Sequence, residues 1–320
     1  MKFGTALFVV MRPQKMRYNY SRSLAKTRTL KAGLTAVFSV LLAGSLFVSL
    51  QFVAFTMSRR NVMFSAAHDS LAGITQVQPI QQTVLDQKLN LKATFDTVQL
   101  QSVLDTWRAK SRGTGSVVVL DADSNELLAQ TNQSQQYFTA SLYKLYIAYL
   151  AIQDIDTGVH TLNETFISGQ TRAQCLNNMI RNSDSTCAEV MMSEQPRAVW
   201  QKRLENLGLK GTNMVRLTTT AQDAAFVTQK IATGEGLSQA STNLLHTAMH
   251  LQIYRDGLQK GFKGLEVYDK VGFYEVGWYD SAFIRLPSGK LVVVAVLTQD
   301  MGTRQVQDLA KKLQPLLAGI

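Results

Sequence analysis

Residues 137–150 of the chain read YFTASLYKLYIAYL, and in this stretch Ser141 and Lys144 stand three positions apart. The pattern predicts a helix that starts at Ser141 and ends at Asp156. Residues three apart on a helix lie on the same face, about one turn from each other. If burial or a cationic neighbour keeps the lysine neutral, its amine can take the proton of the serine hydroxyl. The stretch therefore indicates a nucleophilic serine.

The same spacing occurs a second time, at Ser23 and Lys26 in the basic N-terminal tail, where nothing else indicates catalysis. The interpretation therefore depends on whether the chain supplies further groups. Two segments are candidates: Asn182-Ser183-Asp184-Ser185-Thr186, between two expected helices, and Lys270-Val271-Gly272, on an expected strand. Taken alone, the first is explained by helix capping, because Ser and Asp are favoured N-caps, and the second by an ordinary strand lysine.

Hydrophobic periodicity divides the chain beyond residue 94 into terminal helices, strands and a central helical block. The expected elements are a helix over 95–109, strands over 116–120 and 126–130, helices over 141–156, 171–181, 185–193, 197–207, 221–233 and 239–255, strands over 265–274, 279–286 and 290–298, and a final helix around 306–313. This order predicts an α/β (α+β) fold, in which terminal helices flank a five-stranded antiparallel sheet. An all-helical subdomain is inserted at about 141–260.

The net charge of +10 is concentrated in the N-terminal segment. Residues 1–60 contain ten Lys and Arg and no acidic residue, whereas residues 61–320 contain 23 basic and 23 acidic residues. The main body is therefore neutral overall, which argues against a nucleic-acid-binding domain.

Residues 32–58 carry no charged side chain, and we predict a transmembrane helix over 32–57. Spanning a membrane takes about 20 apolar residues, whereas the core of a signal peptide has about 7–15. Eight Lys and Arg precede the span and two follow it, so 1–31 should be a basic cytoplasmic tail. Residues 58–93 then form a juxtamembrane linker and 94–320 an extracytoplasmic domain held at the cell membrane. Cleavage near residues 65–67 is the alternative to a retained anchor.

The two cysteines, Cys175 and Cys187, both fall in the expected extracytoplasmic part. An oxidising compartment favours a disulfide between them, which would contribute about 2–3 kcal/mol at this spacing. Two buried free thiols are the alternative.

His246 and His250 stand four apart on an expected helix, a spacing that can bind zinc. The chain has no His-Glu-x-x-His motif, and no third ligand suggests itself, so we predict neither a metal nor a cofactor. No histidine lies near Ser141 in the sequence, which argues against a Ser-His-Asp triad.

The three groups follow one another in the order Ser-x-x-Lys, Ser-Asp-x, Lys-x-Gly, at a helix start, an interhelical turn and a late strand. In this combination the chain resembles, over 94–320, the superfamily of class A β-lactamases and penicillin-binding proteins. The order of helices and strands and the segments IDTGVHTLNE and KVGFYEVGWYDSAFI add to the resemblance. It implies a β-lactamase/transpeptidase-like fold and a serine hydrolase.

The resemblance also implies a role for each residue. Ser141 would be the nucleophile that a β-lactam or a peptidoglycan stem peptide acylates, with Lys144 as its base. Ser183 would relay a proton to the departing nitrogen, and Asp184 would hold the turn. The N–H groups of Ser141 and Phe273 would form the oxyanion hole. The implied substrate-binding residues are Ser185, Lys270, Gly272 and Phe273.

Three departures from the family pattern bear on function. Ser185 stands where the family usually has asparagine, and Val271 where it has threonine or serine. The segment 207–218, LGLKGTNMVRLT, is shorter than the omega loop of class A β-lactamases and lacks the glutamate that activates the deacylating water. Acylation could then proceed while hydrolysis of the acyl-enzyme stays slow.

Three functions are compatible with these features. The first is a class A β-lactamase-like hydrolase, and the second a D-alanyl-D-alanine carboxypeptidase or related peptidase that β-lactams would trap. The third is a non-catalytic peptidoglycan-binding module. The missing loop glutamate favours the second, whereas the presence of both serines and both lysines argues against the third.

Overall fold

The computed structural model describes residues 95–275 and 277–319, all within the compact unit Lys88–Ile320. The predicted tail over 1–31, membrane span over 32–57 and linker over 58–93 lie outside the described residues. Within the residues that are described, no helix is both long and apolar enough to cross a membrane.

One five-stranded antiparallel sheet forms the centre of the domain, with strand order β2-β1-β9-β8-β7. Strands β1 and β9 are buried along nearly their whole length, because both of their faces are covered. Strand β7 is an edge strand, and it lies beside the turn that carries Ser141. The strands are β1 (Thr114–Asp121), β2 (Leu127–Thr131), β7 (Glu266–Tyr274), β8 (Gly277–Arg285) and β9 (Leu291–Gln299).

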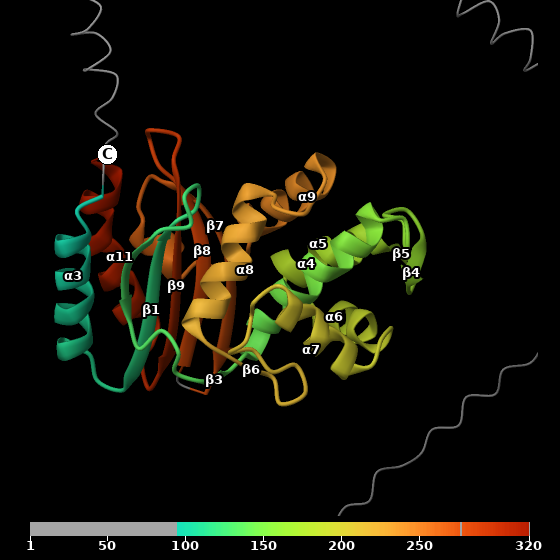
Figure 1. Ribbon diagram of the computed structural model, residues 1–320, viewed down its shortest axis with the longest axis horizontal. Coiled ribbons are helices and arrows are strands. Elements are labelled where there is room, and N and C mark those ends of the chain that lie inside the picture. Colours follow the sequence, from blue (N-terminus) through green and yellow to red (C-terminus); the bar gives the residue numbers. More distant parts are fainter. Residues whose placement is uncertain (1–94, 276, 320) are drawn as a thin grey trace, which may run out of the picture. The chain divides into compact units, whose positions relative to one another are not determined.

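The two terminal helices, α3 (Thr97–Lys110) and α11 (Thr303–Ala318), cover one face of the sheet together (Figure 1). Their apolar stripes meet in a core that includes Leu104, Trp107 and Leu309. The Trp107 indole N–H donates to the Gln305 carbonyl at 2.8 Å, which ties α3 to α11. The short helix α10 (Leu258–Gly261) packs against α11.

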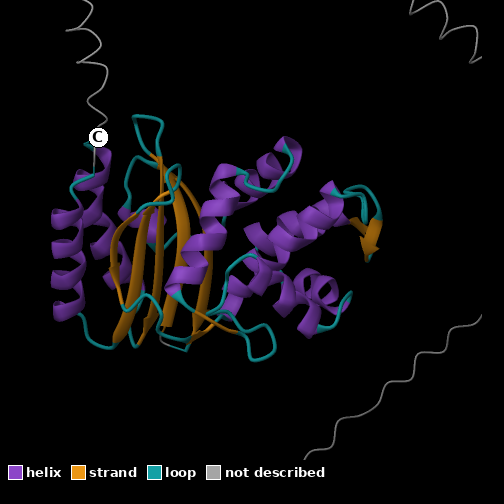
Figure 2. Cartoon of the chain, viewed as in Figure 1, coloured by secondary structure: helices purple, strands orange, loops and turns teal. Residues whose placement is uncertain are grey.

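The opposite face is covered by α8 (Ala221–Thr233), beyond which lies the helical subdomain (Figures 1 and 2). The subdomain contains α4 (Tyr143–Asp156), α5 (Arg172–Arg181), α6 (Ser185–Ser193), α7 (Arg197–Asn206) and α9 (Gln239–His250). Two small antiparallel pairs complete the domain, β3 (Tyr137–Phe138) with β6 (Thr218–Thr219) and β4 (Thr165–Ile167) with β5 (Gln170–Thr171).

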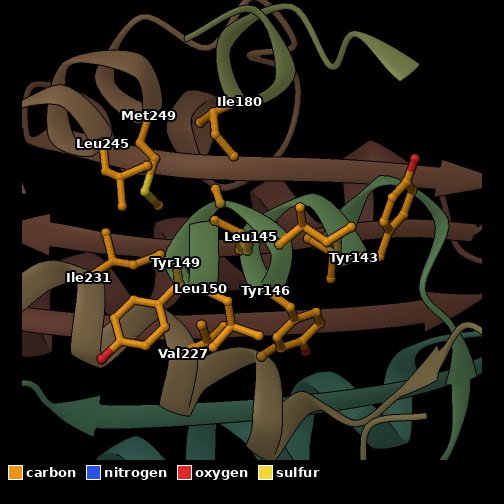
Figure 3. Close-up of a cluster of buried hydrophobic side chains, with 14 of the residues drawn as sticks. Tyr143, Leu145, Tyr146, Tyr149, Leu150, Ile180, Val227, Ile231, Leu245 and Met249 are labelled. Carbon is orange, nitrogen blue, oxygen red and sulfur yellow. The ribbon is translucent and has the colours of Figure 1, made fainter. Parts of the chain in front are cut away.

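Helix α4 is the central helix of the second core, and every residue from Tyr143 to Ile152 is buried (Figure 3). The polar ends of two buried tyrosines are satisfied: the Tyr146 hydroxyl lies 2.5 Å from the Thr219 hydroxyl, and the Tyr149 hydroxyl donates to the Glu235 carbonyl at 2.7 Å. A helix that is covered on all sides also takes its one lysine, Lys144, out of water.

The predicted fold class is confirmed, including the five-stranded antiparallel sheet, the terminal helices and the helical insertion. The helix predicted over 239–255 is wrong at its C-terminal end, because α9 stops at His250. The Arg255 guanidinium donates to the carbonyls of Gln252 and His250, which closes the helix end with a turn. The pairs β3–β6 and β4–β5 and helix α10 were not predicted, because elements of two to four residues show no periodicity.

A disulfide joins Cys175 of α5 to Cys187 of α6, and both residues are buried. Cys175→Ala/Cys187→Ala should lower the free energy of unfolding by about 3 kcal/mol, because the unfolded chain loses a loop constraint. Thermal denaturation of both proteins, with and without reductant, measures the difference. Equal melting temperatures under oxidising conditions would show that the bridge does not stabilise the domain.

Candidate active site

Ser141 lies in a 3-10 turn, Ala140–Leu142, that leads directly into α4. The helix predicted from Ser141 therefore begins two residues later. The Thr139 N–H donates to the Leu217 carbonyl at 2.7 Å, which holds the entry to the turn against the segment before β6. Ala140 has a φ of 43°, a strained value for a residue with a side chain, and such strain gathers at functional sites. The surrounding chain therefore holds the serine in a fixed turn.

The Lys144 side chain connects the Ser-x-x-Lys motif to the turn that carries Ser183 and Ser185. Its Nζ lies 3.2 Å from Ser141 Oγ, 3.1 Å from Ser185 Oγ and 2.5 Å from the Ser183 carbonyl oxygen. Ser185, which the sequence placed in substrate binding, thus also contacts the lysine. These contacts put an amine within proton-transfer distance of the serine hydroxyl.

Lys270 reaches the same cluster from β7. Its Nζ donates to Ser183 Oγ at 2.9 Å and to the Val271 carbonyl at 2.6 Å. Ser183 consequently lies between two lysines, with its carbonyl on Lys144 and its hydroxyl on Lys270. The three sequence motifs, from three separate elements, meet at one point.

The turn between α5 and α6 positions Ser183 through capping bonds. Asp184 caps α6, since its Oδ1 accepts from the Cys187 N–H at 2.9 Å. Its own N–H donates to the Asn178 carbonyl at 3.1 Å, which closes α5. Ser183 has a φ of 59°, a second strained residue at the site. The disulfide bridges the two helices that flank this turn, so it supports the position of the serine.

Burial lowers the pKa of Lys144 to about 8, and the negative charges of Asp184 and Glu189 only partly oppose the shift. Its side chain has no exposed surface. With a pKa of this size roughly a tenth of the lysine is neutral at pH 7, far more than for a lysine in water. The amine is therefore available as a base near neutral pH.

Lys270 is also fully buried, and burial together with the positive charge of Lys144 lowers its pKa. Asp269 and Asp280, on the neighbouring strands β7 and β8, act in the opposite direction. Burial raises the pKa of both carboxyl groups, in Asp280 to about 7. The two aspartates were not identified from the sequence, although Asp269 directly precedes the lysine. An ionised carboxylate at either position favours a cationic Lys270, but the raised pKa values reduce the negative charge that the two groups carry at neutral pH.

Gly272 allows β7 to lie directly against the turn that carries Ser141. A Cβ atom at this position would lie 2.9 Å from the Ser141 nitrogen and 3.2 Å from the Ala140 Cβ. Phe273 is the next residue on the strand, and its side chain is 53% exposed. The two backbone N–H groups predicted for the oxyanion hole therefore come from segments in contact.

Gly272→Ala should reduce acylation of Ser141 about 10²-fold, because displacement of β7 or the turn by a fraction of an ångström misplaces the reacting groups. Gly302→Ala is the matched control, since a Cβ atom there has open space. The measurement is the rate of adduct formation with a penicillin, together with the melting temperature. Equal acylation rates in the two variants would contradict a role for the close approach.

A cavity of about 560 Å³ opens beside Ser185 and the turn that carries Ser141. It is lined by Phe138, Ala140, Tyr143, Ser185, Glu189, Met192, Ser193, Gln195, Arg197 and Leu217. The short segment before β6 closes on itself through two backbone bonds between Asn213 and Thr218, and it contains no acidic residue. Among the described residues, Glu189 is the one acid that lines the cavity.

The two histidines considered for zinc lie elsewhere, in an aromatic cluster. His246 Nε2 lies 2.8 Å from the Ile231 carbonyl, and both His246 and His250 pack against the Tyr268 ring. Within the described part of the chain, no group of three or more His, Cys, Asp or Glu could hold a metal ion.

The family model for the β-lactamase enzyme family matches residues 97–314, which is most of the chain. The chain belongs to this β-lactamase enzyme family. The match covers every residue of the cluster around Ser141, so the family domain contains the whole candidate site. No curated protein matches the sequence significantly.

Several solved structures share the fold. PBP-A has a TM-score of 0.62 and 20% identity, with 70% of this chain and 97% of PBP-A covered. A β-lactamase from Desulfarculus baarsii has a TM-score of 0.63 and 17% identity, with coverage of 70% and 99%. An ancestral class A β-lactamase, GNCA, has a TM-score of 0.62 and 20% identity, with coverage of 67% and 98%. The β-lactamase-like serine hydrolase fold predicted from the motifs is confirmed.

Proposed function

We propose that the protein is a serine acyl-enzyme hydrolase in which a β-lactam or a cell-wall peptide acylates Ser141. The observation that carries this proposal is the 3.2 Å contact between Lys144 Nζ and Ser141 Oγ inside a buried site. A buried amine with a lowered pKa next to a serine hydroxyl is the arrangement that makes serine a nucleophile.

In the proposed acylation, neutral Lys144 takes the proton of the Ser141 hydroxyl while Oγ attacks the carbonyl carbon. The N–H groups of Ser141 and Phe273 stabilise the oxyanion that forms. The carbon–nitrogen bond then breaks, and Ser183 passes a proton to the departing nitrogen. The Ser183 hydroxyl accepts a hydrogen bond from Lys270 at 2.9 Å, which supports this role, and its carbonyl accepts one from Lys144. Lys270 supplies positive charge that orients the substrate carboxylate.

We propose that deacylation is slow. The segment 207–218 is short and carries no acid that could activate a water molecule against the acyl-enzyme. A mutant of PBP-A, which shares this fold, has been solved as an acyl-enzyme complex with penicillin G. This supports the proposal that the fold can hold a covalent β-lactam adduct.

The carboxypeptidase function is the second candidate, and the same loop favours it. An enzyme of cell-wall metabolism would cleave a D-Ala-D-Ala peptide and be trapped by β-lactams, whereas a β-lactamase must release them quickly. A stem peptide of peptidoglycan is then the natural partner. We propose single-pass anchoring through 32–57, with the domain on the extracytoplasmic side, as the charge distribution predicts.

The test is a time course of intact mass for the full-length protein in detergent, incubated with penicillin G or with a D-Ala-D-Ala peptide. A transient adduct with penicillin turnover indicates a β-lactamase. A long-lived adduct, with release of D-alanine from the peptide, indicates the carboxypeptidase. No adduct and no peptide cleavage would contradict both and leave the peptidoglycan-binding module.

A further inference from the structure

Glu189 lies on α6 one helical turn beyond Ser185, four positions further along the chain. Side chains four apart on a helix lie on the same face, with their Cβ atoms about 5–6 Å apart. Ser185 Oγ touches the Lys144 ammonium group at 3.1 Å, so the same face of α6 presents Glu189 toward the catalytic lysine. The glutamate and Ser185 both line the cavity that opens beside the nucleophile.

The carboxylate of Glu189 makes no hydrogen bond and no ion pair within the part of the chain that the structure describes. Its charge nevertheless acts on Lys144 and on the Tyr143 phenol, which shows that it lies near both. Arg197 of α7 is the other charged residue among those that line the cavity, and Asp184 at the start of α6 also acts on Lys144. The glutamate is thus an acceptor without a donor, in a space that is large enough to hold several water molecules.

The position of the cavity determines what a water molecule in it can reach. Ala140 directly precedes the nucleophile, and Ala140 and Tyr143 both belong to the lining. Water in the cavity therefore lies beside the turn that holds Ser141, the residue that would carry the acyl group. The short segment before β6 leaves this space open, with Leu217 at its wall.

We propose that Glu189 is the general base for hydrolysis of the acyl-enzyme, so that the slow deacylation of the proposed function runs through α6 and not through the loop. A water molecule adds to the ester carbonyl carbon while the Glu189 carboxylate takes one of its protons. The oxyanion then collapses and the bond from the carbonyl carbon to Ser141 Oγ breaks. Oγ takes the proton back from Glu189, and the acyl group leaves as a carboxylic acid. The inference rests on the proposed acylation of Ser141.

The test compares acylation and deacylation in the full-length wild-type protein and in its Glu189→Gln variant, with penicillin G as the probe. The rate of adduct formation should not fall, because loss of the Glu189 charge lowers the pKa of Lys144 further and leaves more of the neutral amine. The lifetime of the adduct should increase roughly 10²-fold, the range that a general base contributes.

Glu205→Gln is the matched control, because Glu205 is a partly exposed glutamate on the neighbouring helix α7 and does not line the cavity. It should leave both the rate of adduct formation and the lifetime of the adduct unchanged. An unchanged adduct lifetime in Glu189→Gln would overturn the inference while leaving the proposed function intact. If Glu189→Gln slowed formation and hydrolysis of the acyl-enzyme by the same factor, the inference would also be overturned, because that result would indicate a structural role for Glu189. Absence of any Ser141-dependent adduct in the wild type would overturn the proposed function itself, and the inference with it.

Discussion

Ser141→Ala should abolish the covalent adduct with penicillin completely, whereas the wild type gains the mass of one intact penicillin. The expected effect is the largest of any single substitution, because no other hydroxyl can replace the atom that forms the ester. Unlike Ser183 and Ser185, Ser141 lies in the turn that Gly272 of β7 approaches, where the two N–H groups predicted for the oxyanion hole come together. Intact-mass spectrometry on both proteins, with peptide mapping of the wild-type adduct, measures the result.

The matched control is Ser23→Ala, at the other serine that precedes a lysine by three positions. It should form the adduct at the wild-type rate. An adduct that persists in Ser141→Ala, or one that maps to a peptide without Ser141, would contradict the assignment of the nucleophile. Loss of one hydroxyl leaves the packing of the core around α4 intact, so the melting temperature of Ser141→Ala should differ little from that of the wild type.

Lys144→Met should slow acylation by about 10²–10⁴-fold, because the variant keeps the length of the side chain but loses the base. In the wild type the acylation rate should rise with pH through about 8, the pKa of Lys144. The sign follows from the chemistry: below this pH the ammonium form dominates and cannot accept a proton, and above it the neutral amine can. The measurement is the rate of adduct formation as a function of pH.

Lys202→Met serves as the control, since Lys202 is a highly exposed lysine on α7. The rate of adduct formation in Lys202→Met, and its dependence on pH, should match those of the wild type. A rise in acylation rate near pH 8 that persists in Lys144→Met would show that another group is the base. Lys270 is the group to consider then, because its pKa is lowered as well and its charge is coupled to that of Lys144.

The fold was predictable because its elements are long and strongly patterned. Strand β9 reads LVVVAVLTQ, and α11 carries an apolar stripe through Val306, Leu309 and Leu313. Such segments specify their own conformation through the burial of one face or of both. The end of α9 was not predictable from the same pattern, because the residues that close it do so through side-chain bonds to carbonyls and not through periodicity.

The candidate site was predictable in part. Ser141 and Lys144 are three apart, and helical geometry alone makes them neighbours. Glu189, Asp269 and Asp280 were not identified, because no pattern in the sequence connects an exposed glutamate on α6, or two strand aspartates, with this serine. The spacing of four between Ser185 and Glu189 was the one available signal, and it gains meaning only when Ser185 is known to touch Lys144.

By itself, the sequence determined the order of the elements, the fold class and the residues that carry the three motifs, because these depend on local periodicity and on short spacings. Only the tertiary structure decided which of these residues meet. The bonds from Ser183 to Lys144 and Lys270 join residues that are 39 and 87 positions apart, and such contacts depend on how the elements pack. The same packing buries both lysines, and burial is what lowers their pKa. It also leaves the cavity beside Ser141 open, with the carboxylate of Glu189 at its wall.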